Sequence, residues 1–337
     1  MKTEAAIPFD KQIYYRLIAL WVLCEAVLGG IMHAVKIPFT GIVVSSGAVI
    51  CICLIAYYVP VKGAILKATI IVAIFKMMLS PHTPPTAYIA VFFQGLMGQI
   101  LFFNLRFFRG CCILLAVLAL VESSIQRIIV LTILYGKDFW IALNEFIRKV
   151  TGETSITNYS LVIAGAYIIL HAIVGFMVGL FAGKIVQQSK SWSILHTEYL
   201  IPNPEQYNEV EPIKTKKRKK IKYLFIFIWI ALIVLFLQSY LHIGEPLLPP
   251  LLPLQILLRS LLIILTWYFL LNPLLNSLFK KWLNRQQIKS QHDINQVVLI
   301  LPSTRYIFLK SWELSSSVKG WKRLLVFCKI VLVNILR

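Results

Sequence analysis

Residues 40–59 form a stretch of twenty residues without a charged side chain. A helix of that length spans about 30 Å, the thickness of the hydrocarbon core of a bilayer. The stretch is apolar on every side of a helix, whereas helices of soluble proteins keep a polar face. Apolar residues make up 58% of the chain and charged residues only 14%, which lies outside the range of soluble domains. The chain is therefore predicted to be an all-α, polytopic membrane protein.

Further segments of similar length and composition predict eight membrane spans in total. Four are free of charged residues, and those at 16–34, 63–79, 110–134 and 256–271 carry internal charges. The eight predicted spans are residues 16–34, 40–59, 63–79, 86–103, 110–134, 159–183, 223–241 and 256–271. They predict a six-span N-terminal unit followed by a two-span C-terminal unit.

The basic residues of the connecting loops set the orientation, because cytoplasmic loops of membrane proteins are enriched in lysine and arginine. With the N-terminus inside, the loops predicted to be cytoplasmic carry nineteen basic residues and the opposite loops carry four. The same rule supports the span at 63–79, because leaving it out would invert the predicted orientation of every later span and place the basic loops outside. We expect a multi-pass protein of the plasma (inner) membrane with a cytoplasmic N-terminus.

The net charge of +20 is explained by this asymmetry. Basic loops are attracted to anionic lipid, by about 1 kcal/mol for each residue near the membrane surface. The densest basic run, KTKKRKKIK at 214–222, directly precedes an apolar span, where anchoring charges belong. A nucleic-acid partner is the other interpretation of such a run, and we do not expect one.

The distribution of polar residues predicts three regions. Residues 1–186 hold six spans, residues 187–221 form a polar and basic linker, and residues 222–337 hold two spans and an amphipathic cytoplasmic tail. Breaks in the tail are expected at Pro302 and near Gly320. The piece that begins at WKRLL is expected to lie along the inner membrane surface, with a ninth span as the alternative.

Polar side chains within the spans are candidates for contacting a substrate, because they are costly to place in a bilayer. Each has a second interpretation, which is a hydrogen bond to a neighbouring helix worth about 0.6–2 kcal/mol. Lys67 and Lys76 are expected to extend toward the interfaces instead. The candidate substrate-binding residues are Glu25, His33, His82, Gln94, Glu122 and His171.

His82 belongs to SPHTPP (80–85), a connection whose three prolines cannot lie inside a helix. Pro85 suits the first turn of the following helix, where its missing N–H costs nothing. The connection has two interpretations, the rim of a binding site and a tight structural turn.

Small residues recur every four positions in HAIVGFMVGLFAG (171–183). Gly175, Gly179 and Gly183 thereby flatten one face of the predicted helix, and Ala26 and Gly30 form a shorter version in the first span. Packing within the bundle is the first interpretation of these faces, and a surface for a partner protein is the second.

The sequence contains no enzyme signature. It has no GxSxG, HExxH, phosphate-binding loop or paired-carboxylate motif. The six cysteines lie within or beside apolar segments and lack metal-site spacing. We therefore expect no catalytic residue, no metal site and no cofactor. If the protein takes part in active transport, another polypeptide must supply the energy.

Two stretches carry a resemblance to a known family, GGIMHAVKIPFTGIVVSSGAVI (29–50) and TPPTAYIAVFFQGLMGQILF (83–102). With the six predicted spans, they make residues 1–186 resemble the substrate-binding S components of energy-coupling factor (ECF) transporters. The resemblance implies that six helices enclose a small vitamin or metal ion near the outer face. It also implies that Ala26 and Gly30 contact a transmembrane T component. Metal-binding members have a histidine next to the initiator methionine, where this chain has Lys2.

The tail segment LPSTRYIFLKSWELSSSVKGWKRLL (301–325) is similar to the cytoplasmic coupling helices of T components, which dock on ATPase subunits. The resemblance would give Arg305, Lys310 and Arg323 a coupling role. The function it implies is the capture of a small solute from outside, powered by separate ABC-type ATPase subunits. The alternative is a non-transporting membrane scaffold or assembly protein whose basic tail recruits a cytosolic partner.

Overall fold

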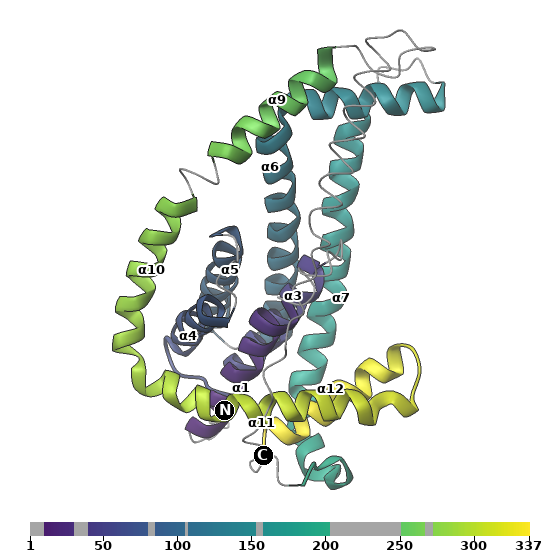
Figure 1. Cartoon of the computed structure of the whole chain (residues 1–337). Coiled ribbons are helices and arrows are strands. Elements are labelled where there is room, and N and C mark those ends of the chain that lie inside the picture. The colour runs from purple at the N-terminus through teal and green to yellow at the C-terminus, as the bar shows by residue number, and fades with distance from the viewer. Residues whose placement is uncertain are drawn as a thin grey trace. The chain divides into compact units, whose positions relative to one another are not determined.

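A computed structural model describes residues 10–29, 40–79, 85–104, 107–152, 158–202, 251–266 and 272–337 (Figure 1). This part of the chain is helical and contains no strand, which confirms the all-α prediction. Its helical elements are α1 (Lys11–Val22), the π-helical turn η1 (Leu23–Leu28), α3 (Thr40–Tyr58), α4 (Ala64–Leu79), α5 (Pro85–Leu101), α6 (Phe108–Thr151), α7 (Tyr159–Leu195), α9 (Leu251–Thr266), α10 (Asn272–Lys289), α11 (Gln291–Leu314) and α12 (Trp321–Ile335).

Three helices of the described part are long and apolar enough to cross a membrane, namely α3, α6 and α7. Helices α4 and α5 are apolar but shorter, with 16 and 17 residues. At about 1.5 Å per residue, each falls a few ångströms short of a hydrocarbon core. The apolar helices support a membrane protein, while the arrangement of six plus two spans stays a prediction. The predicted span at 223–241 lies outside the described residues.

Contacts between the helices divide the chain into two compact units. Unit 1 comprises Met1–Leu120, Ala172–Pro212 and Phe279–Arg337, and unit 2 comprises Val121–His171 and Ile213–Leu278. Helices α6 and α7 therefore contribute residues to both units. The domain boundaries expected from composition, at residues 186 and 221, stay predictions.

In the apolar bundle of unit 1, two hydrogen bonds show how pairs of helices run relative to one another. The Tyr14 hydroxyl donates to the Ala64 carbonyl oxygen at 2.8 Å, which joins the starts of α1 and α4. Arg109 Nε, near the start of α6, donates to Gln187 Oε1, near the end of α7, at 2.7 Å. Helices α1 and α4 therefore run in the same direction, and α6 and α7 run in opposite directions, as in an up-and-down bundle with short connections.

The glycine face of α7 packs against α6 within unit 1. A Cβ atom on Gly175 would lie 2.9 Å from the Ala116 carbonyl oxygen, and one on Gly179 would overlap the Cα of Ile113. Gly183 is less crowded, because the nearest atom to its Cβ position would be Arg109 Cγ at 3.4 Å. This packing within the chain agrees with the first of the two interpretations of the glycine repeat.

A proline and a glycine determine local structure in α5 and α6. Pro85 is the first residue of α5, the position expected for it. Gly136 has a φ of 73° inside α6, so the helix kinks there before it continues to Thr151. Glycine adopts this left-handed conformation without the steric cost that a Cβ atom imposes.

The expected break at Pro302 is wrong, because α11 continues through it. Proline in a helix interior loses one backbone hydrogen bond and costs about 3 kcal/mol. Among the described elements, α11 makes its most extensive contact with α1 (Figure 1), and this packing outweighs the local cost. The break near Gly320 is confirmed, since Gly320 has a φ of 65° and immediately precedes α12.

Candidate functional site

Glu25 and Lys76 form an ion pair in the interior of unit 1. Lys76 Nζ donates to Glu25 Oε2 at 2.6 Å, and the side chains of Lys76 and Glu25 are only 8% and 2% exposed. The ammonium group also lies 3.5 Å from the carbonyl oxygen of Ala87, in the first turn of α5. Charges this deeply buried require a partner, because an isolated charge in a low-dielectric interior is strongly unfavourable.

Glu25 is positioned by the π-helical turn η1, which continues directly from α1. Such turns are rare in helices and frequently occur at functional sites. Glycines of η1 and α3 bring the two elements close together. A Cβ on Gly47 would lie 3.1 Å from Cys24 Sγ, and one on Gly29 would lie 3.4 Å from Val44 Cγ2. This packing helps to shield the carboxylate from water.

The expectation that Lys76 extends toward an interface is wrong. Its side chain is buried because Glu25 offers it a partner within the bundle. The sequence held a partial signal for this pair, because a glutamate and a lysine lie on two predicted spans that run in the same direction. Their equal depth follows only from the structure, in which the Tyr14–Ala64 hydrogen bond aligns the two helices. Glu25 lies eleven residues after Tyr14, and Lys76 lies twelve residues after Ala64.

Gln94 is a second buried polar residue of unit 1, with an exposed fraction of 1%. Its amide nitrogen donates to the hydroxyl oxygen of Ser45 on α3 at 3.1 Å. Its carbonyl oxygen has no hydrogen-bond partner within the part of the chain that the structure describes. A buried acceptor without a partner costs about 1–3 kcal/mol. Gln94 therefore offers an unused acceptor inside an otherwise apolar bundle.

The other candidate residues do not join this pair among the described contacts. Glu122 and His171 belong to unit 2. Glu122 is half-buried, and its Oε2 has no partner in the described structure. His171 Nδ1 lies 2.9 Å from the Tyr167 carbonyl oxygen one turn earlier, which is a local structural contact. Ala26 is buried within η1, whereas Gly30, His33 and His82 lie outside the described residues.

Asp293 forms a polar junction at the other end of α4. It accepts hydrogen bonds from Lys67 Nζ at 3.0 Å and from the Tyr15 hydroxyl at 2.8 Å. Burial by itself raises the pKa of Asp293, but the bonds from Lys67 and Tyr15 outweigh it and leave that pKa below its ordinary value. The junction connects α11 to both α1 and α4.

The three candidate coupling residues of the tail have different surroundings. Lys310 forms a surface ion pair with Glu313 at 3.0 Å. Arg323 lies 4.2 Å from the centre of the Trp312 ring and donates to the Trp312 carbonyl oxygen. Arg305 is half-buried on α11. The contacts of Arg323 connect α12 to α11 and thereby stabilise the hairpin that these two helices form.

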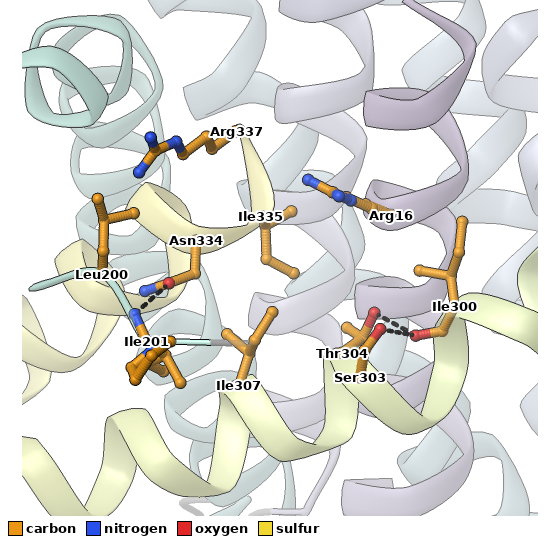
Figure 2. Close-up of a pocket in the computed structure, with 11 residues that line it drawn as sticks. Arg16, Leu200, Ile201, Ile300, Ser303, Thr304, Ile307, Asn334, Ile335 and Arg337 are labelled. Atoms are coloured by element: carbon orange, nitrogen blue, oxygen red, sulfur yellow. Dashed lines mark hydrogen bonds between the residues drawn. The ribbon is translucent and has the colours of Figure 1, made fainter. Parts of the chain in front are cut away.

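Neither of two cavities in the described part of unit 1 is lined by Glu25, Lys76 or Gln94. The larger, of about 420 Å³, lies among α1, α11, α12 and residues 200–202 (Figure 2). The smaller, of about 180 Å³, lies near Pro60 and Asn104. Within the described residues, no group of three or more His, Cys, Asp or Glu side chains could hold a metal ion.

Comparisons with protein families, with curated proteins and with solved structures found no match. The buried ion pair and the unpaired Gln94 carbonyl are therefore interpreted from their own chemistry.

Proposed function

We propose that the protein is an integral membrane component of a transporter that captures a small solute from outside, with separate ATPase subunits supplying the energy. The observation that carries the proposal is the Glu25–Lys76 ion pair, buried in an apolar bundle. Ionisable residues inside membrane helices are rare and commonly mark the path of a substrate or ion. Replacement of a buried ion pair by apolar residues is often neutral or stabilising, so stability alone gives little reason for its presence.

Gln94 adds a second argument, because its carbonyl oxygen is already desolvated and has no described partner. A solute with a hydrogen-bond donor would relieve that cost on binding, which is a source of both affinity and specificity. The two stretches that resemble ECF S components, 29–50 and 83–102, include Ser45, Ala87 and Gln94. Gln94 and Ser45 therefore belong to the stretches that carry the resemblance, whereas Glu25 and Lys76 lie outside them.

Native mass spectrometry of the purified full-length chain tests the proposal. We expect a retained small molecule, co-purifying ATPase subunits, and loss of the small molecule in the variant Gln94→Met. The matched control is Gln291→Met, which removes the same amide from the exposed start of α11. Retention of the small molecule by Gln94→Met, or its absence from the wild-type protein, would contradict the proposed site.

The scaffold alternative has one observation in its favour. In the hairpin of α11 and α12, Leu309 and Trp312 are exposed, and so are Lys319 and Lys322 where the chain enters α12, a combination suited to a cytosolic partner. This alternative predicts that Lys319→Glu/Lys322→Glu abolishes function while Gln94→Met is tolerated. The transporter proposal predicts the opposite for Gln94→Met, so a growth or uptake assay with both variants separates the two functions.

A further inference from the structure

The smaller cavity of unit 1 lies where the connection between α3 and α4 meets the end of α5. It has a volume of about 180 Å³, and the residues that line it all belong to unit 1. Its described lining combines aliphatic side chains with Lys62, Gln99 and Asn104, and it includes no Asp or Glu. The cavity therefore has a positively charged group in its wall and no negatively charged one.

Gln99 brings an unused hydrogen-bond acceptor to this cavity. Its side-chain carbonyl oxygen is shielded from water and has no hydrogen-bond partner within the described part of the chain. A shielded acceptor of this kind costs free energy until a donor reaches it. A ligand that fills the cavity and carries a hydroxyl or N–H group would therefore gain affinity from a bond to Gln99.

Lys62 supplies the positive charge of the cavity. Its ammonium nitrogen lies 5.5 Å from the centre of the Phe103 ring, and the ion pairs of the described residues do not include it. At an exposed position an aromatic ring attracts an ammonium group only weakly, and it does not neutralise the charge. The ring therefore holds the ammonium group beside the cavity and leaves it able to pair with an anion.

Apolar side chains around the cavity indicate where the ligand comes from. Val61 and Phe103 line the cavity and are exposed, and so is Ile100, the residue after Gln99. Exposed apolar side chains grouped in this way are suited to contact with acyl chains. The predicted orientation places the connection between α3 and α4 at the cytoplasmic face, where anionic phospholipids provide both a negative charge and acyl chains.

We propose that this cavity binds the head group of an anionic phospholipid that carries a hydroxyl group. Lys62 pairs with the phosphate, the hydroxyl donates to the Gln99 carbonyl oxygen, and the acyl chains contact Phe103. The cavity is smaller than the usual small-molecule site, so it suits a compact head group and not a whole lipid. The glycerol head of phosphatidylglycerol has the required charge and donor. The site does not depend on the proposed transport function.

Native mass spectrometry of the full-length protein in detergent tests both contacts with two lipids that have the same acyl chains. Phosphatidylglycerol and phosphatidylmethanol each carry one negative charge, but phosphatidylmethanol lacks the hydroxyl. We expect Gln99→Met to bind phosphatidylglycerol about three- to tenfold more weakly, the effect of one lost hydrogen bond. The same variant should bind phosphatidylmethanol like the wild type. Lys62→Gln should bind both lipids about fivefold more weakly, because one basic residue near an anionic head group is lost.

Two control variants make the same changes outside the cavity. Gln291→Met and Lys319→Gln alter exposed positions and are expected to bind both lipids like the wild type. Thermal unfolding in the same detergent checks that the cavity variants fold. Both should unfold like the wild type, because Lys62 is exposed and the Gln99 carbonyl has no described partner to lose. If Gln99→Met fails to fold, the equal weakening of both lipids by Lys62→Gln still tests the site.

The lipid affinities decide between the site and its alternatives. Unchanged binding of both lipids in Gln99→Met and Lys62→Gln would overturn the site. Equal weakening of both lipids by Gln99→Met would contradict the bond between the hydroxyl and Gln99. Glycerol phosphate is the head group without acyl chains. If it binds as tightly as phosphatidylglycerol and is equally sensitive to both variants, the ligand is a soluble phosphate ester and the phospholipid is overturned.

Discussion

Helix α4 carries two lysines that each pair with a carboxylate. The two pairs have the same chemistry but differ in how much of their side chains is exposed. Lys67 and Lys76 are nine residues apart, about 14 Å along the helix. The side chains of Lys67 and Asp293 are 51% and 12% exposed, whereas those of Lys76 and Glu25 are 8% and 2% exposed. Water solvates much of the first pair and little of the second.

The difference in burial separates an ion pair with a structural role from one that indicates function. The partly exposed pair joins α11 to α4, and contacts of this kind contribute up to about 1 kcal/mol. The buried pair gains a stronger attraction but loses the hydration of both ions, so its net contribution is small or unfavourable. We infer that the contact with Asp293 is structural and that the contact with Glu25 is functional.

The variant Glu25→Gln is expected to have the largest effect, because it leaves the Lys76 ammonium buried without a countercharge. The free energy of unfolding should fall by about 3–5 kcal/mol, measurable by thermal or denaturant unfolding in detergent. The double variant Glu25→Leu/Lys76→Met should unfold like the wild type or at a higher temperature. If Glu25→Gln is as stable as the wild type, the ammonium group of Lys76 must be hydrated in the folded protein. The proposed contrast between the buried and the partly exposed pair would then be wrong.

Gln94→Met is expected to change stability in the opposite direction. The substitution keeps the length of the side chain and removes a buried carbonyl oxygen that has no described partner. The free energy of unfolding should stay constant or rise by about 1 kcal/mol, in the same unfolding assay. Ser45→Ala removes the acceptor of the Gln94 amide instead, and it should destabilise the protein because the amide N–H then loses its hydrogen bond. Equal effects of the two variants would contradict this description of the bundle interior.

Asp293→Asn removes the negative charge of the partly exposed pair with Lys67 and should cost about 1 kcal/mol. The loss is expected to be local, because Asp293 joins α11 to α1 and α4. Faster amide hydrogen exchange in α11, with unchanged exchange in α3, is the measurement. The matched control is Glu313→Gln, which breaks the surface pair with Lys310 within α11. Faster exchange throughout unit 1 would contradict a local effect and would show that the contacts of Asp293 stabilise the whole bundle.

Acid should reproduce the effect of Asp293→Asn more weakly and only at low pH. The native pKa of Asp293 lies below its ordinary value of 3.8. The contribution of its ionised form is therefore complete above pH 3.8 and is lost as the pH falls through the lower native pKa. Exchange protection of α11 should be constant from neutral pH down to pH 3.8 and should decline as the pH falls through the native pKa of Asp293. In Asp293→Asn, the part of this decline that Asp293 causes should be absent. A loss of protection above pH 3.8 would show that another group titrates.

Sequence reasoning succeeded where neighbouring residues determine the structure. The uncharged stretch at 40–59 forms α3, Pro85 begins α5, and Gly320 precedes α12. The spacing of Gly175 and Gly179 correctly indicated a helix face built for close packing. Each of these features depends on periodicity, backbone conformation or side-chain size, all of which are properties of a short segment.

Sequence reasoning failed where segments distant in the chain decide the outcome. Pro302 indicates a helix end, but packing against α1 keeps α11 continuous. Lys76 was expected at an interface, but Glu25 on another helix draws it into the interior. Glu25 and Gln94, two of the candidate substrate-binding residues, are buried in the structure, but their partners Lys76 and Ser45 were not expected. Partner choice depends on helix rotation, which side-chain packing sets and single-segment patterns do not record.

The contact between Asp293 and Tyr15 has a consequence for how the protein is made. The two residues are separated by 278 positions, so the face of α1 that α11 covers is synthesised long before its cover. At roughly 5–20 residues per second, the ribosome needs on the order of 14–56 seconds to produce the intervening chain. During that interval the first helix must be shielded by lipid, by the insertion machinery or by a chaperone.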